Sequence, residues 1–247
     1  MTNLRHQFRL FSRTTIRTTA FWGVLLLAVA QVSFGEEKKV EKYPPLKKDK
    51  DGWITLFDGK TLKGWEITKF GGEGEVAVKG GAIEMGFGTD LTGIHTEREL
   101  PKTNYEVELE AMRVDGTDFF CGMTFPVKKD PCSLILGGWG GGVCGLSSID
   151  DMDASENETT TYRAFKNKKW YKIRLKVTDK KIEAWLDGKQ IVEQDLKGKK
   201  ISIRYEVELS KPFGFACWQT SAALKNIRIR SLADAPKPEA KPKKKDS

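Results

Sequence analysis

Apolar and basic side chains alternate in residues 170–177, WYKIRLKV, and this stretch decides the fold. Successive side chains of an extended chain point to opposite faces, so the apolar set would be buried and the basic set solvated. Residues 182–186, IEAWL, continue in the same way, Asp187-Gly188 marks a tight turn, and residues 190–192, QIV, return. The stretch predicts antiparallel strands of a sheet with one buried and one solvated face.

The same pattern extends to both sides of this stretch. Residues 105–111, YEVELEA, alternate apolar with acidic side chains, and residues 224–230, LKNIRIR, form an expected last strand. Two short strands over residues 75–78 and 82–85 flank the turn Lys79-Gly80-Gly81. No amphipathic helix of ten or more residues is evident. We therefore expect an all-β fold of two packed sheets, with acidic and basic rows facing one another on a wet surface.

Residues 1–35 have the three parts of a signal peptide. Four Arg and no Asp or Glu precede an apolar run over residues 20–32, and the small Ser33 and Gly35 suit a cleavage site. A membrane anchor would need about 20 apolar residues. A mitochondrial presequence stays open, although it would be amphipathic. We expect export to the periplasm or the extracellular space, with no stable membrane span after the signal is removed.

The net charge of +8 belongs mainly to the ends of the chain. The leader contributes +4, residues 36–51 contribute +1 and residues 233–247 contribute +2, which leaves about +1 for residues 52–232. We interpret residues 36–51 as a linker and residues 233–247 as a disordered Lys/Pro tail. The tail would solubilise the protein or contact the cell envelope. The folded part is not expected to bind nucleic acid.

Four cysteines in an exported chain raise the question of disulfides. Cys121, Cys132, Cys144 and Cys217 allow three complete pairings, and their spacings match no zinc pattern. Each lies in an apolar or glycine-rich segment that resembles a strand. One disulfide and buried free thiols therefore both stay open.

Residues 52–65, GWITLFDGKTLKGW, carry a second kind of signal. Their pattern L-F-D/N-G-K-x-L-x-G-W resembles the opening of the 3-keto-disaccharide hydrolase family of exported bacterial domains. Residues 169–177, 182–189 and 224–230 agree with it, so the resemblance covers about residues 52–232. It implies a concanavalin-like jelly-roll β-sandwich of two antiparallel sheets. The motif itself supplies a turn and core residues, so it defines a fold rather than a site.

The resemblance also implies a reaction on sugars that carry a ketone at C3. A base removes the hydrogen on C2, an enolate forms, the C1 substituent leaves, and water is added. Such a site needs a base near C2 and a cation or hydrogen-bond donor at the C3 oxygen. A divalent metal held by His and carboxylates would serve the second role, and its identity is left open.

Four residues are candidates for catalysis: His95, Asp118, Asp151 and Glu156. His95 is the only histidine outside the leader, and on an expected strand a structural histidine is the commoner role. Asp118 precedes an apolar run, where it could be a carboxylate with a raised pKa or, as we favour, a turn residue. Asp151 and Glu156 belong to residues 150–158, DDMDASENE, which could bind calcium, hold a catalytic acid or form a solvated loop. The solvated loop is the favoured interpretation.

Candidates for sugar binding centre on residues 136–142, LGGWGGG. Glycine weakens strand pairing, so this run marks either an exposed loop or a close approach of backbones. Trp139 in a loop could stack on the apolar face of a sugar ring, and as a core residue it would not. Trp218, Gln219 and Arg163 are weaker candidates for contacts with the expected carbohydrate partner.

One region departs from the family pattern. Typical members have an N-S-G-I-x-x-R segment followed by an E-x-Q-I-x-D strand. Here the corresponding residues 118–125 read DFFCGMTF and residues 133–138 read SLILGG, without those polar residues. Two hypotheses follow: an exported enzyme that cleaves 3-keto-glycosides by elimination and hydration, or a non-catalytic module that binds glycans or has a structural role in the envelope.

Overall fold

The computed structural model describes residue 43 and residues 46–235. The predicted signal peptide, most of the linker and the end of the tail lie outside the described residues. Export therefore stays a prediction, which the N-terminal sequence of the mature protein, expected to begin at Glu36, would test. Among the residues that the structure describes, no helix is long and apolar enough to cross a membrane.

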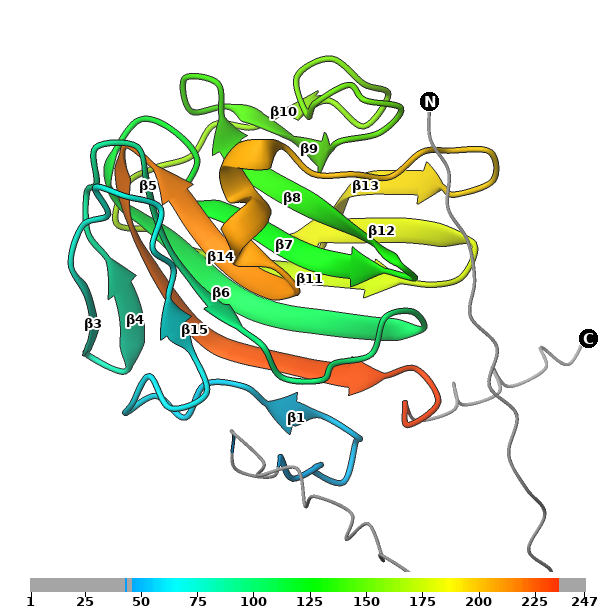
Figure 1. The fold of residues 1–247 in the computed structure, drawn as a ribbon, viewed down its shortest axis with the longest axis horizontal. Coiled ribbons are helices and arrows are strands. Elements are labelled where there is room, and N and C mark those ends of the chain that lie inside the picture. The colour runs from blue at the N-terminus through cyan, green and yellow to red at the C-terminus, as the bar shows by residue number, and fades with distance from the viewer. Residues whose placement is uncertain (1–42, 44–45, 236–247) are drawn as a thin grey trace, which may run out of the picture. The chain divides into compact units, whose positions relative to one another are not determined.

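Fifteen strands in the described part of the chain pair into two antiparallel sheets (Figure 1). The eight-stranded sheet has the order β13-β12-β11-β6-β15-β4-β3, with β1 also paired to β15. Its strands are β1 (Ile54–Thr55), β3 (Val76–Lys79), β4 (Ala82–Met85), β6 (Tyr105–Gly116), β11 (Trp170–Val177), β12 (Lys181–Leu186), β13 (Lys189–Asp195) and β15 (Thr220–Ser231).

The seven-stranded sheet has the order β10-β9-β8-β7-β14-β5-β2. Its strands are β2 (Glu66–Ile67), β5 (Leu91–Thr96), β7 (Cys121–Val127), β8 (Asp130–Gly138), β9 (Val143–Ser147), β10 (Thr161–Tyr162) and β14 (Phe213–Trp218). One 3₁₀ helix, η1 (Tyr205–Ser210), precedes β14.

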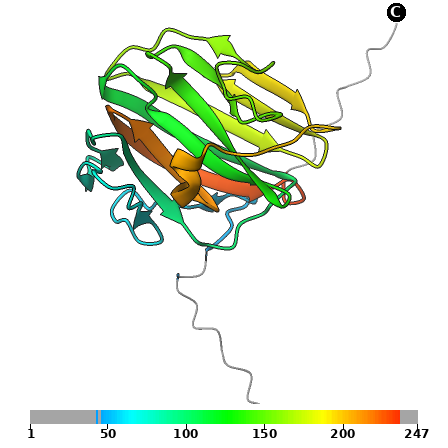
Figure 2. The same ribbon diagram turned by 45° about the horizontal axis from the view of Figure 1, so that its top comes forward.

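The inner faces of the two sheets form one hydrophobic core (Figure 2). The apolar set of β11, Tyr171, Ile173, Leu175 and Val177, is at most 4% exposed. It joins phenylalanines of the other sheet in the same cluster, and burial of each such side chain contributes about 1.5–3 kcal/mol. The predicted all-β fold of two sheets is confirmed.

Acidic and basic rows face one another on the outer surface of the eight-stranded sheet, as the sequence predicts. Glu108 of β6 lies opposite Arg174 of β11 in the strand register. Glu106, the next outward carboxylate of β6, is 1% exposed. It accepts hydrogen bonds from Arg174 and from Arg230 of β15. The Glu106 carboxylate therefore links the three central strands of this sheet.

The structure decides between the two cysteine alternatives. All four thiols are free and buried. Burial raises the pKa of Cys132 and of Cys217 to about 12 and that of Cys144 to about 11. Burial also raises the pKa of Cys121, with a smaller contribution from Cys217. These thiols stay protonated at neutral pH and act as small core side chains.

Small residues make room on the outer face of the seven-stranded sheet. Gly93, Ala216 and Gly122 are neighbours across β5, β14 and β7. A Cβ atom at Gly93 would lie 3.0 Å from the Phe70 ring, and one at Gly122 would lie 3.0 Å from the Phe119 ring. The two glycines thus accept aromatic rings against the sheet.

The helix η1 lies over the same face of the seven-stranded sheet (Figure 1). Its Val207 packs against Leu91 and Ala216. This packing fixes the segment from residue 204 to residue 207 above the sheet, where its polar side chains border a pocket.

Candidate functional site

A pocket of about 220 Å³ opens on the outer face of the seven-stranded sheet. Its walls come from the segment before β7, the turn between β8 and β9, the end of β14, and η1. Three of the residues that the sequence suggested for catalysis or sugar binding line this pocket: Asp118, Trp139 and Trp218. Segments that are far apart in the sequence thus meet at one site.

One wall of the pocket is aromatic and is formed by Phe119, Trp139 and Trp218. Trp139 is 43% exposed and lies at the turn between β8 and β9. Trp139 is therefore not a core residue but an exposed one, and the run also contains a close approach of backbones, because a Cβ atom at Gly141 would lie 2.5 Å from the Thr117 carbonyl oxygen. Exposed aromatic rings beside a pocket offer flat apolar surface to a ligand.

Asp118 holds the turn that carries Trp139. One carboxylate oxygen accepts a hydrogen bond from the Phe119 amide at 2.7 Å, and the other accepts one from the Gly140 amide at 3.0 Å. Both oxygens are therefore engaged by backbone N–H groups. The geometry makes Asp118 a positioning residue for Trp139, in agreement with the favoured turn interpretation.

An ion pair of Arg204 and Glu206 also lines the pocket. The Arg204 Nη2 atom lies 2.6 Å from Glu206 Oε1, and Nε donates to the second carboxylate oxygen at 3.2 Å. Nη1 of Arg204 donates to Asp153 at 2.9 Å. Burial has the largest single influence and opposes ionisation of Glu206, but the hydrogen bonds from Arg204, a backbone hydrogen bond and the charge of Arg204 together hold the pKa of that carboxyl below its ordinary value. Glu206 is therefore an anion at neutral pH.

Two serines of the sheet, Ser133 and Ser147, line the pocket beside the apolar Leu91 and Ile135. Ser133 and Thr124 share a hydrogen bond of 2.9 Å between their hydroxyl groups. The Ser147 side chain also lines the pocket, is 1% exposed, and its hydroxyl has no hydrogen-bond partner among the described residues. A buried hydroxyl without a partner loses about 1–3 kcal/mol of solvation that a bound ligand can restore.

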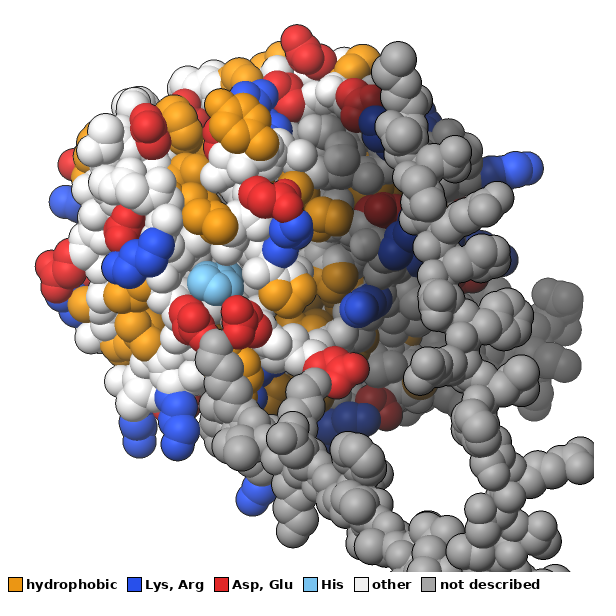
Figure 3. Space-filling view, viewed as in Figure 1, with side chains coloured by type: hydrophobic (Ala, Val, Ile, Leu, Met, Phe, Trp, Pro, Cys, Tyr) orange, Lys and Arg blue, Asp and Glu red, His pale blue; other side chains and the backbone are white. Residues whose placement is uncertain are grey.

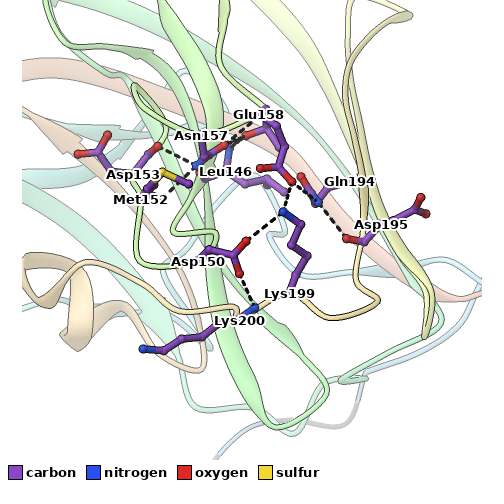
Figure 4. Close-up of polar contacts among 11 residues, drawn as sticks. Leu146, Asp150, Met152, Asp153, Asn157, Glu158, Gln194, Asp195, Lys199 and Lys200 are labelled. Carbon is purple, nitrogen blue, oxygen red and sulfur yellow. Dashed lines mark hydrogen bonds and ion pairs between the residues drawn. The ribbon is translucent and has the colours of Figure 1, made fainter.

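None of the residues 150–158 lines the pocket, although Asp153 accepts a hydrogen bond from Arg204, which does. Figure 4 shows the polar contacts of this acidic loop. Asp151 is exposed and pairs with Lys200 at 2.8 Å, and Glu156 is exposed as well. Asn157 organises the loop, because its Nδ2 donates to three backbone carbonyl oxygens. The structure therefore does not bring Asp151 or Glu156 to the pocket.

Two of the weaker binding candidates also lie elsewhere. Arg163 donates a hydrogen bond to the Tyr162 carbonyl oxygen at 2.9 Å, at the β10 edge of the sheet. Gln219 follows Trp218, but its side-chain amide donates to the Thr89 carbonyl oxygen at 3.1 Å. Neither side chain lines the pocket.

His95 is placed in a different group of side chains. Its Nδ1 atom lies 2.9 Å from the hydroxyl oxygen of Thr68. Potential ligand atoms of Glu66, His95 and Glu97 all lie within 4.8 Å of one another. Figure 3 shows the pale blue histidine next to acidic side chains on this face. The donor set of one imidazole and two carboxylates suits a divalent metal ion.

A second, larger groove of about 680 Å³ crosses the outer face of the eight-stranded sheet. Some of its polar side chains are paired with one another: Arg228 forms an ion pair with Glu108, and the Asn226 amide donates a hydrogen bond to Glu110. Arg174 lies 4.8 Å from the centroid of the Trp185 ring. Among the described residues that line the groove, no buried polar side-chain atom lacks a hydrogen-bond partner, whereas the pocket has the Ser147 hydroxyl.

Sequence reasoning missed Arg204, Glu206 and Ser147. Arg204 and Glu206 belong to a surface segment of ordinary composition, and no spacing in the sequence connects them with Trp139. Ser147 ends β9 and is adjacent to another serine, so only the sheet register shows that it faces the pocket.

The architecture defines a class of protein: a jelly-roll sandwich of two antiparallel sheets with an aromatic pocket on one sheet. The chain belongs to the family of 3-keto-alpha-glucoside-1,2-lyase-like domains, whose family model matches residues 52–230. The resemblance indicated by the opening motif is thereby confirmed. A search of curated proteins finds no match to the chain.

The chain is also similar to several solved structures. A Crh5 transglycosylase in complex with NAG has 16% identity and a TM-score of 0.53, over 77% of this chain and 88% of that one. The carbohydrate-binding module CBM66 from Bacillus subtilis has 13% identity and a TM-score of 0.41, over 76% of this chain and 100% of that one. A prokaryotic beta-1,3-1,4-glucanase from a mouse hindgut metagenome has 8% identity and a TM-score of 0.45, over 68% and 92%.

Proposed function

We propose that the domain binds a saccharide in the pocket of the seven-stranded sheet and cleaves 3-keto-glycosides there by elimination. The composition of the pocket carries this proposal. Aromatic side chains, among them Trp139, line the same pocket as the Arg204–Glu206 pair and Ser147, whose hydroxyl has no partner among the described residues. A sugar ring has apolar C–H faces and a rim of hydroxyl groups, so it complements both kinds of surface.

Membership of the lyase-like family supports the reaction. In this scheme the Glu206 carboxylate takes the proton from C2, and the electron pair moves to give an enolate with its charge on the C3 oxygen. Arg204, next to Glu206, stabilises that charge. The enolate then reforms the C3 carbonyl, a C1=C2 double bond forms, and the C1–O bond breaks.

The remaining steps return the proton and complete the hydrolysis. The leaving-group oxygen takes the proton held by Glu206 and departs as an alcohol. Addition of water at C1, with a proton at C2, turns the conjugated enone into a free 3-keto sugar. The low pKa makes Glu206 a modest base, and stabilisation of the enolate by Arg204 compensates for this.

A metal at His95 takes no part in this scheme. His95 lies four residues along β5 from Leu91, which lines the pocket. A strand rises by about 3.3 Å per residue, so the two positions are about 13 Å apart. That separation is too large for contact with a sugar ketone beside Leu91.

The proposal is tested by incubating the protein with a 3-keto-disaccharide and, in parallel, with the unoxidised disaccharide. Release of the C1 substituent from the keto form alone is the expected result, because only a C3 ketone acidifies the C2 hydrogen. An enone intermediate would add absorbance in the near ultraviolet. No release from the keto form, with or without added divalent metal, would overturn the catalytic part.

A second candidate function is glycan binding without catalysis. It is favoured by one observation: both carboxylates of the pocket are already engaged, Asp118 by two backbone amides and Glu206 by Arg204. In this case saccharides would change the tryptophan emission of the protein without turnover. A response to saccharides combined with product release would instead support the enzyme.

The Ser147 hydroxyl gives a prediction that separates binding from stability. Ser147→Ala removes a buried hydroxyl that has no partner in the described structure, so the free protein should keep or gain about 1 kcal/mol of stability. Its affinity for a saccharide should fall about fivefold, because one hydrogen bond is lost. Thermal unfolding and calorimetric titration measure the two effects. Unchanged affinity would remove Ser147 from the proposed site.

A further inference from the structure

Three potential metal ligands meet where the short edge strand β2 pairs with β5. Glu66 of β2 and His95 of β5 are direct partners in the sheet register. Glu97 follows the last residue of β5. The ligand atoms of the three side chains lie within 4.8 Å of one another. Two separate segments of the chain are therefore needed to assemble the group.

We propose that Glu66, His95 and Glu97 bind a Zn²⁺ ion or another divalent transition-metal ion that prefers the same types of ligand. An imidazole nitrogen with two carboxylate oxygens is a set that Zn²⁺ accepts, while Ca²⁺ and Mg²⁺ prefer oxygen ligands alone. Three protein ligands leave a fourth position for water. In a tetrahedral Zn²⁺ site ligand atoms are about 3.3 Å apart, so rotations of the side chains suffice to close the site around an ion.

Neighbouring side chains orient two of the three ligands. Thr68, which is fully buried, contacts Nδ1 of His95 at 2.9 Å. This contact occupies Nδ1 and leaves Nε2 as the ring nitrogen for a ligand. The Tyr43 hydroxyl donates to Glu66 Oε1 at 2.9 Å. Such outer contacts fix the tautomer and the direction of metal ligands in proteins.

The position of the group indicates a structural role for the ion. The strand β2 has two residues and pairs with β5 through two residue pairs. A metal bound by Glu66 and His95 would crosslink this edge strand to the sheet. The site is also separate from the saccharide pocket, since His95 lies four residues along β5 from Leu91, which lines the pocket. The inference therefore does not depend on the proposed function.

Calorimetric titration of the chain with ZnCl₂ tests the inference. We expect saturable binding of one ion per chain, weakened at least tenfold in each of Glu66→Gln, Glu97→Gln and His95→Gln. Asp151→Asn in the acidic loop and Glu206→Gln in the pocket are matched controls that should bind Zn²⁺ as the parent does. Absence of saturable binding to the parent, or equal binding by all three ligand variants, would overturn the inference.

A second measurement protects against variants that fail to fold. Thermal unfolding without metal reports whether each variant has a cooperative transition. Added Zn²⁺ should raise the midpoint of the parent and of Asp151→Asn, because a ligand that binds only the folded state stabilises it. It should leave folded Glu66→Gln unchanged. An equal rise in Glu66→Gln would place the ion elsewhere and contradict the inference.

Discussion

Replacement of Glu206 by Gln is expected to slow release of the C1 substituent from a 3-keto-disaccharide by about 10²- to 10⁴-fold. Glutamine has the same shape and keeps an acceptor for Arg204, but it cannot take the C2 proton. The KM should change little, because the aromatic side chains and the two serines of the pocket are untouched. Initial rates over a range of substrate concentrations measure both parameters.

Glu208→Gln is the matched control for this variant. Glu208 lies on the same helix, η1, but pairs with Lys211 and does not line the pocket. Its substitution should leave the rate unchanged. Equal rates in the parent and Glu206→Gln would show that another group is the base.

The same carboxylate determines the expected pH dependence. Glu206 is active as a base only when it is deprotonated, and hydrogen bonds from Arg204 hold its pKa below the ordinary 4.5 despite opposing burial. Activity should therefore persist as the pH falls to this value and be lost only below it. A loss of kcat/KM that begins near neutral pH would indicate a different ionising group.

Replacement of Glu106 by Ala should lower the free energy of unfolding by about 3 kcal/mol. The carboxylate is 1% exposed and pairs with Arg174 and Arg230, so its removal leaves two guanidinium groups without their partner. Because Arg174 is 43% exposed, water can solvate part of its charge. The expected loss of stability therefore lies at the low end of the range for removing one partner of a buried ion pair. Urea denaturation with an unchanged m value measures the effect.

Two further variants serve as controls for the stability loss in Glu106→Ala. Glu193→Ala removes an exposed carboxylate that pairs with Lys181 and should not change stability measurably. Glu106→Gln keeps the shape and an acceptor, so it should fall between the parent and Glu106→Ala. A stability of Glu106→Ala equal to that of the parent would show that the buried ion pair is not needed by this sheet.

The fold could be predicted because alternation is a local property. Residues 170–177 and 105–111 each show which face is buried, and the opposite charges on their outer faces agree with their pairing as β11 and β6. The helix η1 could not be predicted, since Val207 is held by Leu91 and Ala216 from distant strands. No local signal in YEVELS indicates a helix at residues 205–210.

The candidate site could be predicted only in part. Trp139 is a candidate from the sequence because a tryptophan lies within a glycine-rich run, and Trp218 is a weaker aromatic candidate. Both line the pocket. Arg204 and Glu206 look like ordinary surface residues until the chain folds over the seven-stranded sheet. His95 was noticeable as a lone histidine, but only the register of β2 and β5 places Glu66 beside it.

The missing polar residues of the family pattern also have a structural counterpart. At the corresponding positions of β7 and β8 the outer face carries Gly122, Thr124, Ser133 and Ile135. Gly122 accepts the Phe119 ring. Apart from Asp118 and Ser133, the polar groups of the pocket come from η1, from its preceding residue Arg204, and from β9.

The central claim is that saccharides bind at the aromatic pocket rather than in the groove of the other sheet. The most direct test uses the Glu206→Gln variant, which should bind a 3-keto-disaccharide without turnover. Its affinity, measured by calorimetric titration, is compared with that of two double variants, which carry Trp139→Ala or Trp185→Ala in addition. We expect at least tenfold weaker binding with Trp139→Ala, or about 1.4 kcal/mol, and no change with Trp185→Ala in the groove. Unchanged affinity with Trp139→Ala, or a loss confined to Trp185→Ala, would contradict the account.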